Sequence, residues 1–306
     1  MRKIKLNGGG YEAVILPEFG ANCVSLKHVS SGAMLLRTPE TEDEFIKTPF
    51  LYGMPLLFPP NRIEDGRFDF AGRTYSFSIN EPERNVHLHG KLYQTPFGVE
   101  CTKENEASFV YRATKENPYY DYDALSVQII YSLDETGLKQ TVTISNEGEE
   151  LVPIGLGFHT AIPMPFLPNG KAEDVLLQGA VGAEYARDSE RLLTAWDPLP
   201  DSEIHQGIKE GTFSPNGRAM SAQYLCGENR VMRIMDRLSG IAVVYELSEP
   251  YFSWLTWKPK ESAFLCIEPQ SWLVNAPNAP KPECAGLISV EPHQKAEFSA
   301  RLFLSL

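Results

Sequence analysis

The chain has 306 residues, of which 42% are hydrophobic and 22% are charged, and its formal net charge at pH 7 is −12. This composition predicts a globular protein with a substantial core. The acidic balance argues against nucleic acids and anionic membranes as partners, because phosphate groups would be repelled, and it favours a neutral small molecule as the ligand.

Turn-forming residues and alternating polarity predict strands in the first half of the chain. A first hairpin is expected over residues 67–70 and 73–77. Three segments farther along alternate between turn sequences at Asp134 to Gly137 and Asn146 to Gly148, namely residues 124–133, 138–145 and 151–161. Alternation between turns is typical of antiparallel strands that have one face in water.

The second half of the chain continues this strand-rich pattern. Short helices are expected over residues 173–178 and 183–188. The remaining predictions are a strand pair at 241–247 and 264–268, followed by strands at 286–290 and 296–304. We find no repeat and no linker, so we expect a single all-β domain over residues 1–306, built as a sandwich of antiparallel sheets.

Cysteine usage and the N-terminal sequence bear on location. The five cysteines are scattered and form no Cys-x-x-Cys pair, which is typical of reduced thiols in a cytosolic protein and not of a disulfide framework or zinc site. The first ten residues lack the apolar core of a signal peptide, and no apolar run approaches the ~20 residues that span a bilayer. We therefore expect a cytoplasmic monomer or homodimer with no membrane partner.

Two side chains at strand ends are candidates for acid–base chemistry. His159 follows Gly157 and Phe158 and precedes a proline-rich loop, where a histidine could transfer protons or be held by a backbone carbonyl. Glu268 directly follows an apolar strand, so its carboxylate is paired, exposed at the mouth of a site, or functional.

Other polar and aromatic residues admit structural interpretations. His87 and His89 would share one face of a strand, but no third ligand lies nearby, so we expect no metal. Taken singly, Arg62 and Asp236 would be solvated charges. Trp254 and Trp257 fit a core better than a sugar platform. The chain has no phosphate-binding glycine loop and no Gly-x-Ser-x-Gly segment, so we expect no nucleotide cofactor.

Four short segments, taken together and in this order, resemble the aldose 1-epimerase (galactose mutarotase) family. They are Pro60-Asn61-Arg62-Ile63, residues 85–90 ending in His89-Gly90, Gly157-Phe158-His159, and Glu268-Pro269-Gln270. The resemblance covers about residues 49–278. It implies a β-supersandwich of antiparallel sheets with an open sugar cleft that needs no cofactor.

The resemblance also implies roles for individual residues. Glu268 would be the general base and His159 the general acid for opening a sugar ring. Asn61, Arg62 and His89 would bind sugar hydroxyls, and Asp236 is the best match for a further hydroxyl ligand. These roles predict an enzyme that interconverts the α and β anomers of a free, unphosphorylated hexose.

Three other functions stay open at this point. Lys91 follows the His-Gly pair where the family usually has a second glycine, and Arg84 keeps a hexose-6-phosphate 1-epimerase in view. A non-catalytic carbohydrate-binding module could keep Arg62 and His89 without the acid–base pair. A glycosidase needs two carboxylates, which Asp236 and Glu268 could supply, but His159 would then have no role.

Overall fold

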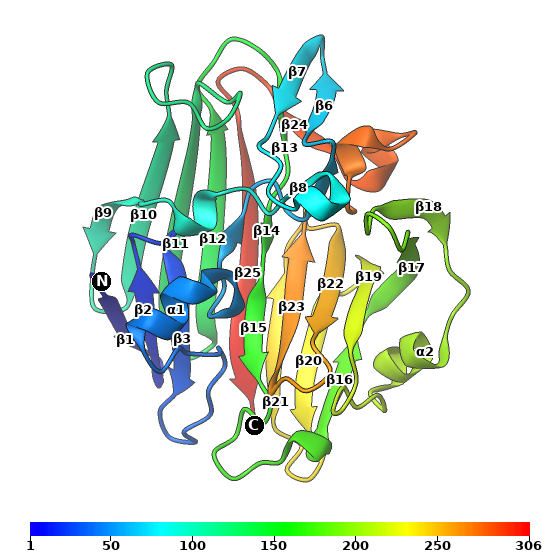
Figure 1. Ribbon diagram of the computed structural model, residues 1–306. Coiled ribbons are helices and arrows are strands. Elements are labelled where there is room, and N and C mark those ends of the chain that lie inside the picture. Colours follow the sequence, from blue (N-terminus) through cyan, green and yellow to red (C-terminus); the bar gives the residue numbers. More distant parts are fainter.

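The computed structural model describes residues 1–306, and two eight-stranded sheets form its frame (Figure 1). The first sheet has the order β16 (Val175–Gly179), β20 (Val231–Asp236), β21 (Ala242–Leu247), β25 (Lys295–Ser305), β12 (Gly137–Asn146), β11 (Leu125–Asp134), β10 (Glu106–Ala113) and β9 (Gly98–Thr102). The second has the order β18 (Thr194–Pro198), β17 (Val181–Arg187), β19 (Met220–Cys226), β22 (Ser253–Lys258), β23 (Phe264–Gln270), β14 (Gly157–Phe158) and β4 (Leu56–Leu57), with β15 (Thr160–Pro163) also paired to β23.

Smaller sheets complete the fold. At the N-terminus β1 (Ile4–Gly8), β2 (Tyr11–Leu16) and β3 (Asn22–His28) form a three-stranded sheet, which lies in front of β9 to β12 in Figure 1. The two-stranded pairs are β5 (Arg62–Glu64) with β8 (Val86–Leu88), β6 (Arg67–Phe70) with β7 (Arg73–Ser76), and β13 (Val152–Ile154) with β24 (Ile288–Val290). All strand pairs of the sheets are antiparallel, which confirms the predicted all-β sandwich.

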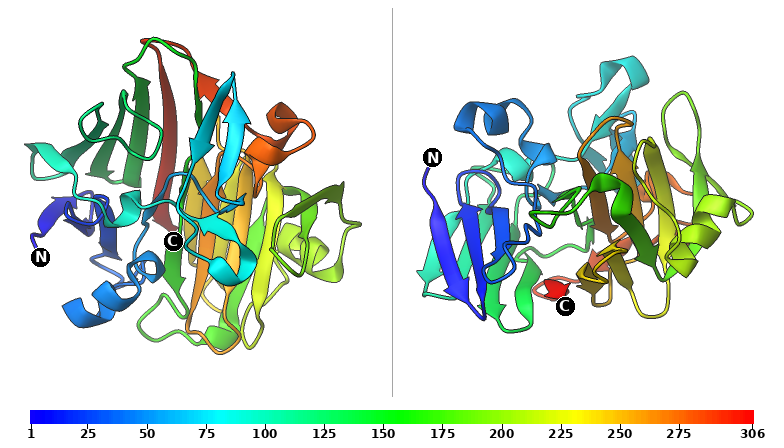
Figure 2. Two further views of the ribbon diagram at one scale, coloured as in Figure 1. Left: turned by 45° about the horizontal axis from the view of Figure 1, so that its top comes forward. Right: turned by 90° about the horizontal axis from the view of Figure 1, so that it is seen from below.

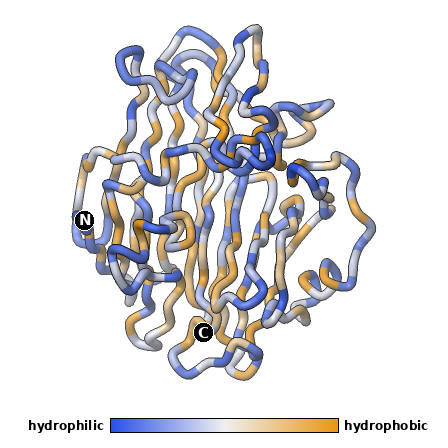
Figure 3. The backbone as a smooth tube through the Cα atoms, viewed as in Figure 1, coloured by the Kyte–Doolittle hydropathy of each residue, from blue (hydrophilic) through white to orange (hydrophobic).

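The core lies between these layers and contains one cluster of 64 buried residues. Figure 2 shows the layers edge-on from below, and Figure 3 shows hydrophobic and hydrophilic residues alternating along many strands. Tyr245 of the first large sheet and Trp254 of the second have ring centroids 5.7 Å apart. The alternation follows from the strand period of two, which sends successive side chains to opposite faces. β23 is different, because all seven of its residues are buried.

The predicted hairpins are confirmed. Residues 67–77 form the β6–β7 pair, and residues 124–145 form β11 and β12 in a continuous register from Leu125 opposite Asn146 to Asp134 opposite Gly137. The last two predicted strands appear as β24 and β25. The expected strand 151–161 is divided into β13, β14 and the start of β15, because its parts pair with different strands.

Two predictions of secondary structure are wrong. Residues 173–178 contain only a 3₁₀ turn, Ala172–Asp174, before β16, and residues 183–188 lie in and just after strand β17. Pairing with β20 and β19 decides the conformation of these segments over their local preference. The segments 241–247 and 264–268 do not pair with each other, because β21 and β23 belong to different sheets.

Two short α-helices were missed. α1 (Glu42–Lys47) begins after Thr41, whose side chain accepts a hydrogen bond from the Glu44 amide, and Thr41-x-x-Glu44 is a capping-box sequence. α2 (Glu203–Glu210) begins after Ser202, whose side chain accepts from the His205 amide, and ends at Gly211 in the left-handed region. No helix in the structure has the length and apolarity required to span a membrane.

Gly90 provides a test of how tightly the loop after β8 is packed. It has a φ of +67°, and a Cβ atom there would lie 1.9 Å from the Phe58 carbonyl oxygen. Gly72 has a similar φ of +80° but has open space around it. We expect Gly72→Ala to cost about 1–2 kcal/mol for the left-handed backbone alone. Gly90→Ala should cost at least about 2 kcal/mol more, because the Phe58 backbone must move.

The measurement is urea unfolding of both variants beside the unmodified protein. Equal losses of unfolding free energy in the two variants would show that the loop carrying Gly90 adjusts freely and does not hold a fixed shape.

Candidate active site

His159 and Glu268 lie opposite each other on neighbouring strands. In the pairing of β14 and β15 with β23, Gly157 faces Gln270 and Thr160 faces Ile267. The two pairs belong to one continuous antiparallel register. In this register His159, which lies between β14 and β15, is opposite Glu268. The His159 amide instead donates to the Pro55 carbonyl at 3.0 Å. Directly opposed residues of antiparallel strands bring their side chains together.

These two side chains form a buried contact. His159 Nε2 lies 3.2 Å from Glu268 Oε1, and the side chains are only 5% and 1% exposed. Burial raises the pKa of Glu268 to about 8, although Arg187, the Gln270 side chain and Arg62 oppose the shift. Burial lowers the pKa of His159 to about 4. Desolvation therefore disfavours the charged form of each group, while their contact allows them to hold one proton between them.

The second nitrogen of His159 has no partner. Nδ1 is buried and makes no hydrogen bond within the protein. A protonated imidazole needs acceptors for two N–H groups, and here only Glu268 supplies one. This arrangement makes the proton on His159 easy to release.

Asn61 and His89 hold each other beside this pair. The His89 amide donates to the Asn61 carbonyl at 3.0 Å, and the Asn61 amide donates to His89 Nδ1 at 3.2 Å. Both residues have positive φ angles, 61° and 67°. Burial, together with the nearby His159 and Arg62, holds the pKa of His89 well below its usual value. A neutral ring whose Nδ1 accepts a hydrogen bond leaves Nε2–H as a donor.

Arg62 begins β5 at the edge of the same cleft. Its Nε and Nη2 donate to the two carboxylate oxygens of Glu81 at 2.6 and 2.9 Å. A two-point contact of this kind fixes the plane of the guanidinium and neutralises its charge. Its remaining N–H groups stay available to neutral acceptors such as sugar hydroxyls.

Aromatic and aliphatic side chains form the walls of the cleft. The cavity encloses about 150 Å³. It is lined by Asn61, Arg62, His89, His159 and Glu268, together with Phe50, Leu88, Arg187, Leu192, Ser221, Leu255 and Trp257. The Phe50 and Trp257 rings lie 5.7 and 5.8 Å from the His159 ring. Trp257 is half-buried at the cleft and Trp254 is fully buried, so only Trp254 is a core residue. This volume lies below the roughly 300–1,000 Å³ of pockets that enclose a drug-sized ligand, so the cleft would take only a small one.

Arg187 is a cleft residue that the sequence did not reveal. It ends β17, and its Nη2 donates to the carbonyl and the hydroxyl of Ser221 on β19. Burial, with the nearby Arg62, lowers the pKa of Arg187 to about 10. The sequence predicted a helix over residues 183–188, so Arg187 was not identified as a site residue. The side chain of Arg187 is directed into the cleft by the register of β17 with β19.

Asp236 is not among the residues that line the cleft, so its expected role as a sugar ligand is wrong. It ends β20, in the other large sheet, where its carboxylate accepts hydrogen bonds from the Ser239 amide and hydroxyl at 2.8 Å. The carboxylate therefore caps a turn.

His87 does not share a face with His89. Its Nδ1 contacts the Ser78 carbonyl at 2.7 Å, and its Nε2 accepts from the Gly90 amide at 3.0 Å. The strand ends at Leu88, and the positive φ of His89 turns that side chain elsewhere. Nowhere do three or more His, Cys, Asp or Glu side chains form a group that could hold a metal ion.

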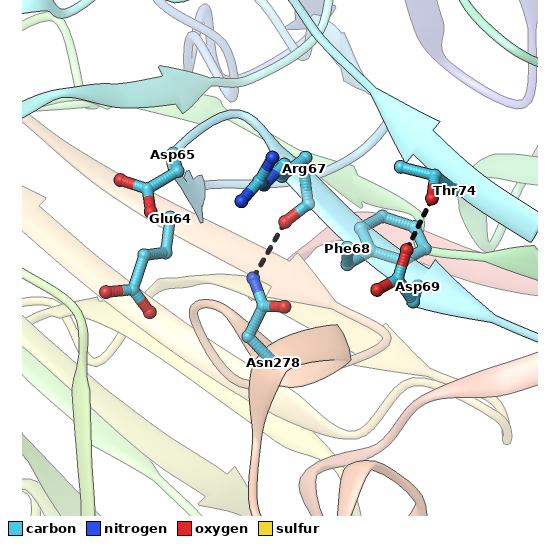
Figure 4. Close-up of a pocket in the computed structure, with 7 residues that line it drawn as sticks. All are labelled: Glu64, Asp65, Arg67, Phe68, Asp69, Thr74 and Asn278. Carbon is cyan, nitrogen blue, oxygen red and sulfur yellow. Dashed lines mark hydrogen bonds between the residues drawn. The ribbon is translucent and has the colours of Figure 1, made fainter.

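A larger hollow of about 340 Å³ lies beside the β6–β7 hairpin (Figure 4). Its lining includes Glu64, Asp65 and Asp69, but no histidine or cysteine. Two of the three carboxylates are paired with Arg191 at 2.6 Å, and Asp69 accepts from Thr74. All three carboxylates therefore have partners within the protein. This hollow has no buried group without a partner comparable to His159 Nδ1.

Comparison with known proteins identifies relatives of this arrangement. The family model described as "Aldose 1-epimerase" matches residues 2–302. A galactose mutarotase-like protein from Clostridium acetobutylicum superposes with a TM-score of 0.92 at 28% identity, covering 98% of this chain and 94% of that one.

Two Escherichia coli (strain K12) proteins of uncharacterized function are also similar in sequence. YphB is 25% identical over 81% of this chain and 82% of its own length. YihR is 29% identical over 51% of this chain, and the match spans only 48% of YihR.

The raised pKa of Glu268 predicts a stability effect. The folded protein holds a proton on this carboxyl up to about pH 8, whereas an unfolded glutamate releases it near its usual pKa of about 4.5. Between these values the folded state binds more protons, so the carboxyl destabilises the fold increasingly as pH rises. Glu268→Gln should therefore be more stable than the unmodified protein by roughly 2 kcal/mol at pH 6, and this gain should grow to about 4 kcal/mol near pH 8.

Unfolding free energies of both proteins at several pH values in this range provide the check. A difference that does not change with pH would mean that Glu268 is already ionised in the folded protein at pH 6.

Proposed function

The chain belongs to the aldose 1-epimerase family, and on that basis we propose that it interconverts the α and β anomers of a free hexose. The reaction would be acid–base ring opening in the cleft around Glu268 and His159. The observation that carries this proposal is the buried contact of 3.2 Å between a carboxyl and an imidazole at the base of a small cavity.

The geometry supports a two-group mechanism. The Glu268 carboxylate takes the proton of the C1 hydroxyl while protonated His159 gives a proton to the ring oxygen. The bond between C1 and the ring oxygen breaks, and C1 becomes an aldehyde carbon. Both oxygens are bonded to C1, so adjacent side chains can reach both. After rotation about the C1–C2 bond the proton transfers run in reverse and close the ring on the other face.

The number of protons on His159 and Glu268 agrees with this mechanism. The pair holds one proton in total, which lies on Glu268 in the resting enzyme. It moves to His159 before the ring opens, and Glu268 is protonated again when it takes the proton of the C1 hydroxyl. Buried groups whose contact is direct exchange a proton without a large change in the net charge of the cleft. Each proton transfer of this type contributes typically about 10²–10⁴-fold to the rate.

The other cleft residues would hold the sugar. Arg62, fixed by Glu81, and neutral His89 present N–H donors to hydroxyl oxygens. Asn61 positions His89 through their mutual hydrogen bonds. The half-buried face of Trp257 can pack against the apolar side of a sugar ring.

The cleft does not contain the second carboxylate that a glycosidase would need. Glu268 is the one Asp or Glu among the residues lining the cleft, whereas hydrolysis between sugars uses a pair. A carbohydrate-binding module would not need the buried acid–base contact. Arg84, which kept the hexose-6-phosphate epimerase in view, donates to the Glu190 carbonyl and does not line the cleft.

Removing either partner should abolish the activity. We expect Glu268→Gln and His159→Asn each to lower the enzymatic rate by about 10²-fold or more while the fold persists. Polarimetry on freshly dissolved α-glucose and α-galactose measures the rate. Glu246→Gln, on β21 outside the cleft, is the matched control and should keep full activity. Unchanged rates in the cleft variants would remove both residues from the mechanism.

The pH profile should show a plateau with two limits. Toward pH 4 and below, His159 and Glu268 both hold protons, so no base is present. Toward pH 8 and above, the pair loses its only proton, so no acid is present. The enzymatic part of kcat/KM should therefore fall at both ends, with apparent pKa values that belong to the pair. A rate that rises steadily through pH 9 would contradict a one-proton pair.

A further inference from the structure

Arg187 is a cleft cation without a carboxylate in contact. Its guanidinium donates only to the carbonyl and hydroxyl of Ser221, which are both neutral acceptors. Arg62, in the same cleft, is neutralised by Glu81. Arg191, between β17 and β18, is paired with Glu64 and Asp65. No carboxylate lies within 4.0 Å of Arg187, although Glu268 lines the same cavity.

The charge of the cleft can be added up for the reactive state. Arg62 and Glu81 cancel, and His89 is uncharged because its pKa is held well below the usual value. Glu268 and His159 together hold one proton, so their net charge is zero whether the proton lies on nitrogen or oxygen. Among the side chains that line the cleft, Arg187 is then the one charge without a partner in contact, although Glu184, three residues earlier on β17, also acts on it electrostatically.

A neutral sugar would not remove this imbalance. A half-buried guanidinium loses part of its hydration, and the lowering of its pKa to about 10 reflects that loss. The positive charge also lowers the pKa of Glu268 and so favours loss of the one proton that Glu268 and His159 hold between them. An anionic substrate would relieve both effects at once.

We propose that the preferred substrate is an aldose that carries a carboxylate, such as a hexuronic acid, and that Arg187 binds this group. The inference rests on the proposed anomerisation and names its substrate class. A planar guanidinium fork matches a carboxylate in a two-point contact. One uncompensated cation balances one negative charge, whereas a phosphate dianion calls for more converging cations. The −12 net charge of the protein weakens long-range attraction of any anion, so the contact must be local.

The test compares sugars that differ only at C6. Anomerisation of glucose, glucuronate, galactose, galacturonate and glucose 6-phosphate is followed by NMR at constant ionic strength. We expect kcat/KM for the better uronate to exceed that of its parent sugar by about tenfold or more. In Arg187→Gln the ratio of kcat/KM for the uronate to kcat/KM for its parent sugar should fall at least tenfold, because only the uronate carries the group that Arg187 binds. Arg187→Lys should restore part of the preference.

Arg233→Gln supplies a matched control for the change in net charge, because Arg233 lies on β20 in the other large sheet. It should leave the uronate preference unchanged. A higher kcat/KM for the parent sugars than for the uronates would overturn the proposal. An equal loss of kcat/KM for both classes of sugar in Arg187→Gln would also overturn it and would mean that Arg187 acts on the ionisation of Glu268. A larger rate with glucose 6-phosphate than with either uronate would overturn the choice of carboxylate.

A binding measurement separates this proposal from the proposed function. If none of these sugars is anomerised, the enzymatic function fails, but calorimetric titration with glucuronate and glucose still tests Arg187. Tighter binding of glucuronate that is lost in Arg187→Gln supports the anion site. Equal affinity for both sugars, or an affinity for glucuronate that Arg187→Gln does not change, contradicts it.

Discussion

The contact between His159 Nε2 and Glu268 Oε1 is the interaction on which the cleft depends. A carboxyl and an imidazole are held 3.2 Å apart with almost no exposed surface. Each is shifted toward its neutral form by burial, and together they hold a single proton. A pair with one shared proton is the minimum that ring opening requires, since one oxygen must lose a proton while the other gains one.

The sandwich supplies the geometry of this pair. β23 lies inside the second large sheet, with β22 on one side and β14 and β15 on the other, and every residue along it is buried. The interruption at His159 leaves its amide bonded to Pro55 and its side chain opposite Glu268. Gly157 keeps this junction close, because a Cβ atom there would lie 2.9 Å from Pro60. Arg62, which begins β5, and the Asn61–His89 pair beside it then close the cleft from outside the large sheets.

Local sequence could predict what is local in this structure. Hairpins with clear turns, and polar residues that follow apolar runs, such as Glu268 and His159, carry their signals within a few neighbours. Glu268 nevertheless lies inside β23, which continues to Gln270, and not after its end as the sequence indicated. Sheet membership does not, so β21 and β23 were paired wrongly. Arg187 was missed because its direction depends on the register with β19 and on the bulge within β17. Asp236 was misplaced because only the turn to Ser239 shows where its carboxylate points. The proximity of His159 and Glu268 followed from the chemistry expected of the four motifs, and the register explains it.

The most direct measurement of the shared proton is an NMR titration. Protein labelled with ¹⁵N in histidine and with ¹³C in the glutamate carboxyl is followed from pH 3.5 to pH 9.5, with His159→Asn and Glu268→Gln used for assignment. The account predicts that the His159 ring nitrogens and the Glu268 carboxyl shift together in one step near the upper end of this range, as the pair loses its proton, and again toward the lower end. Separate titration of an ordinary glutamate and an ordinary histidine, each near its usual pKa, would contradict it.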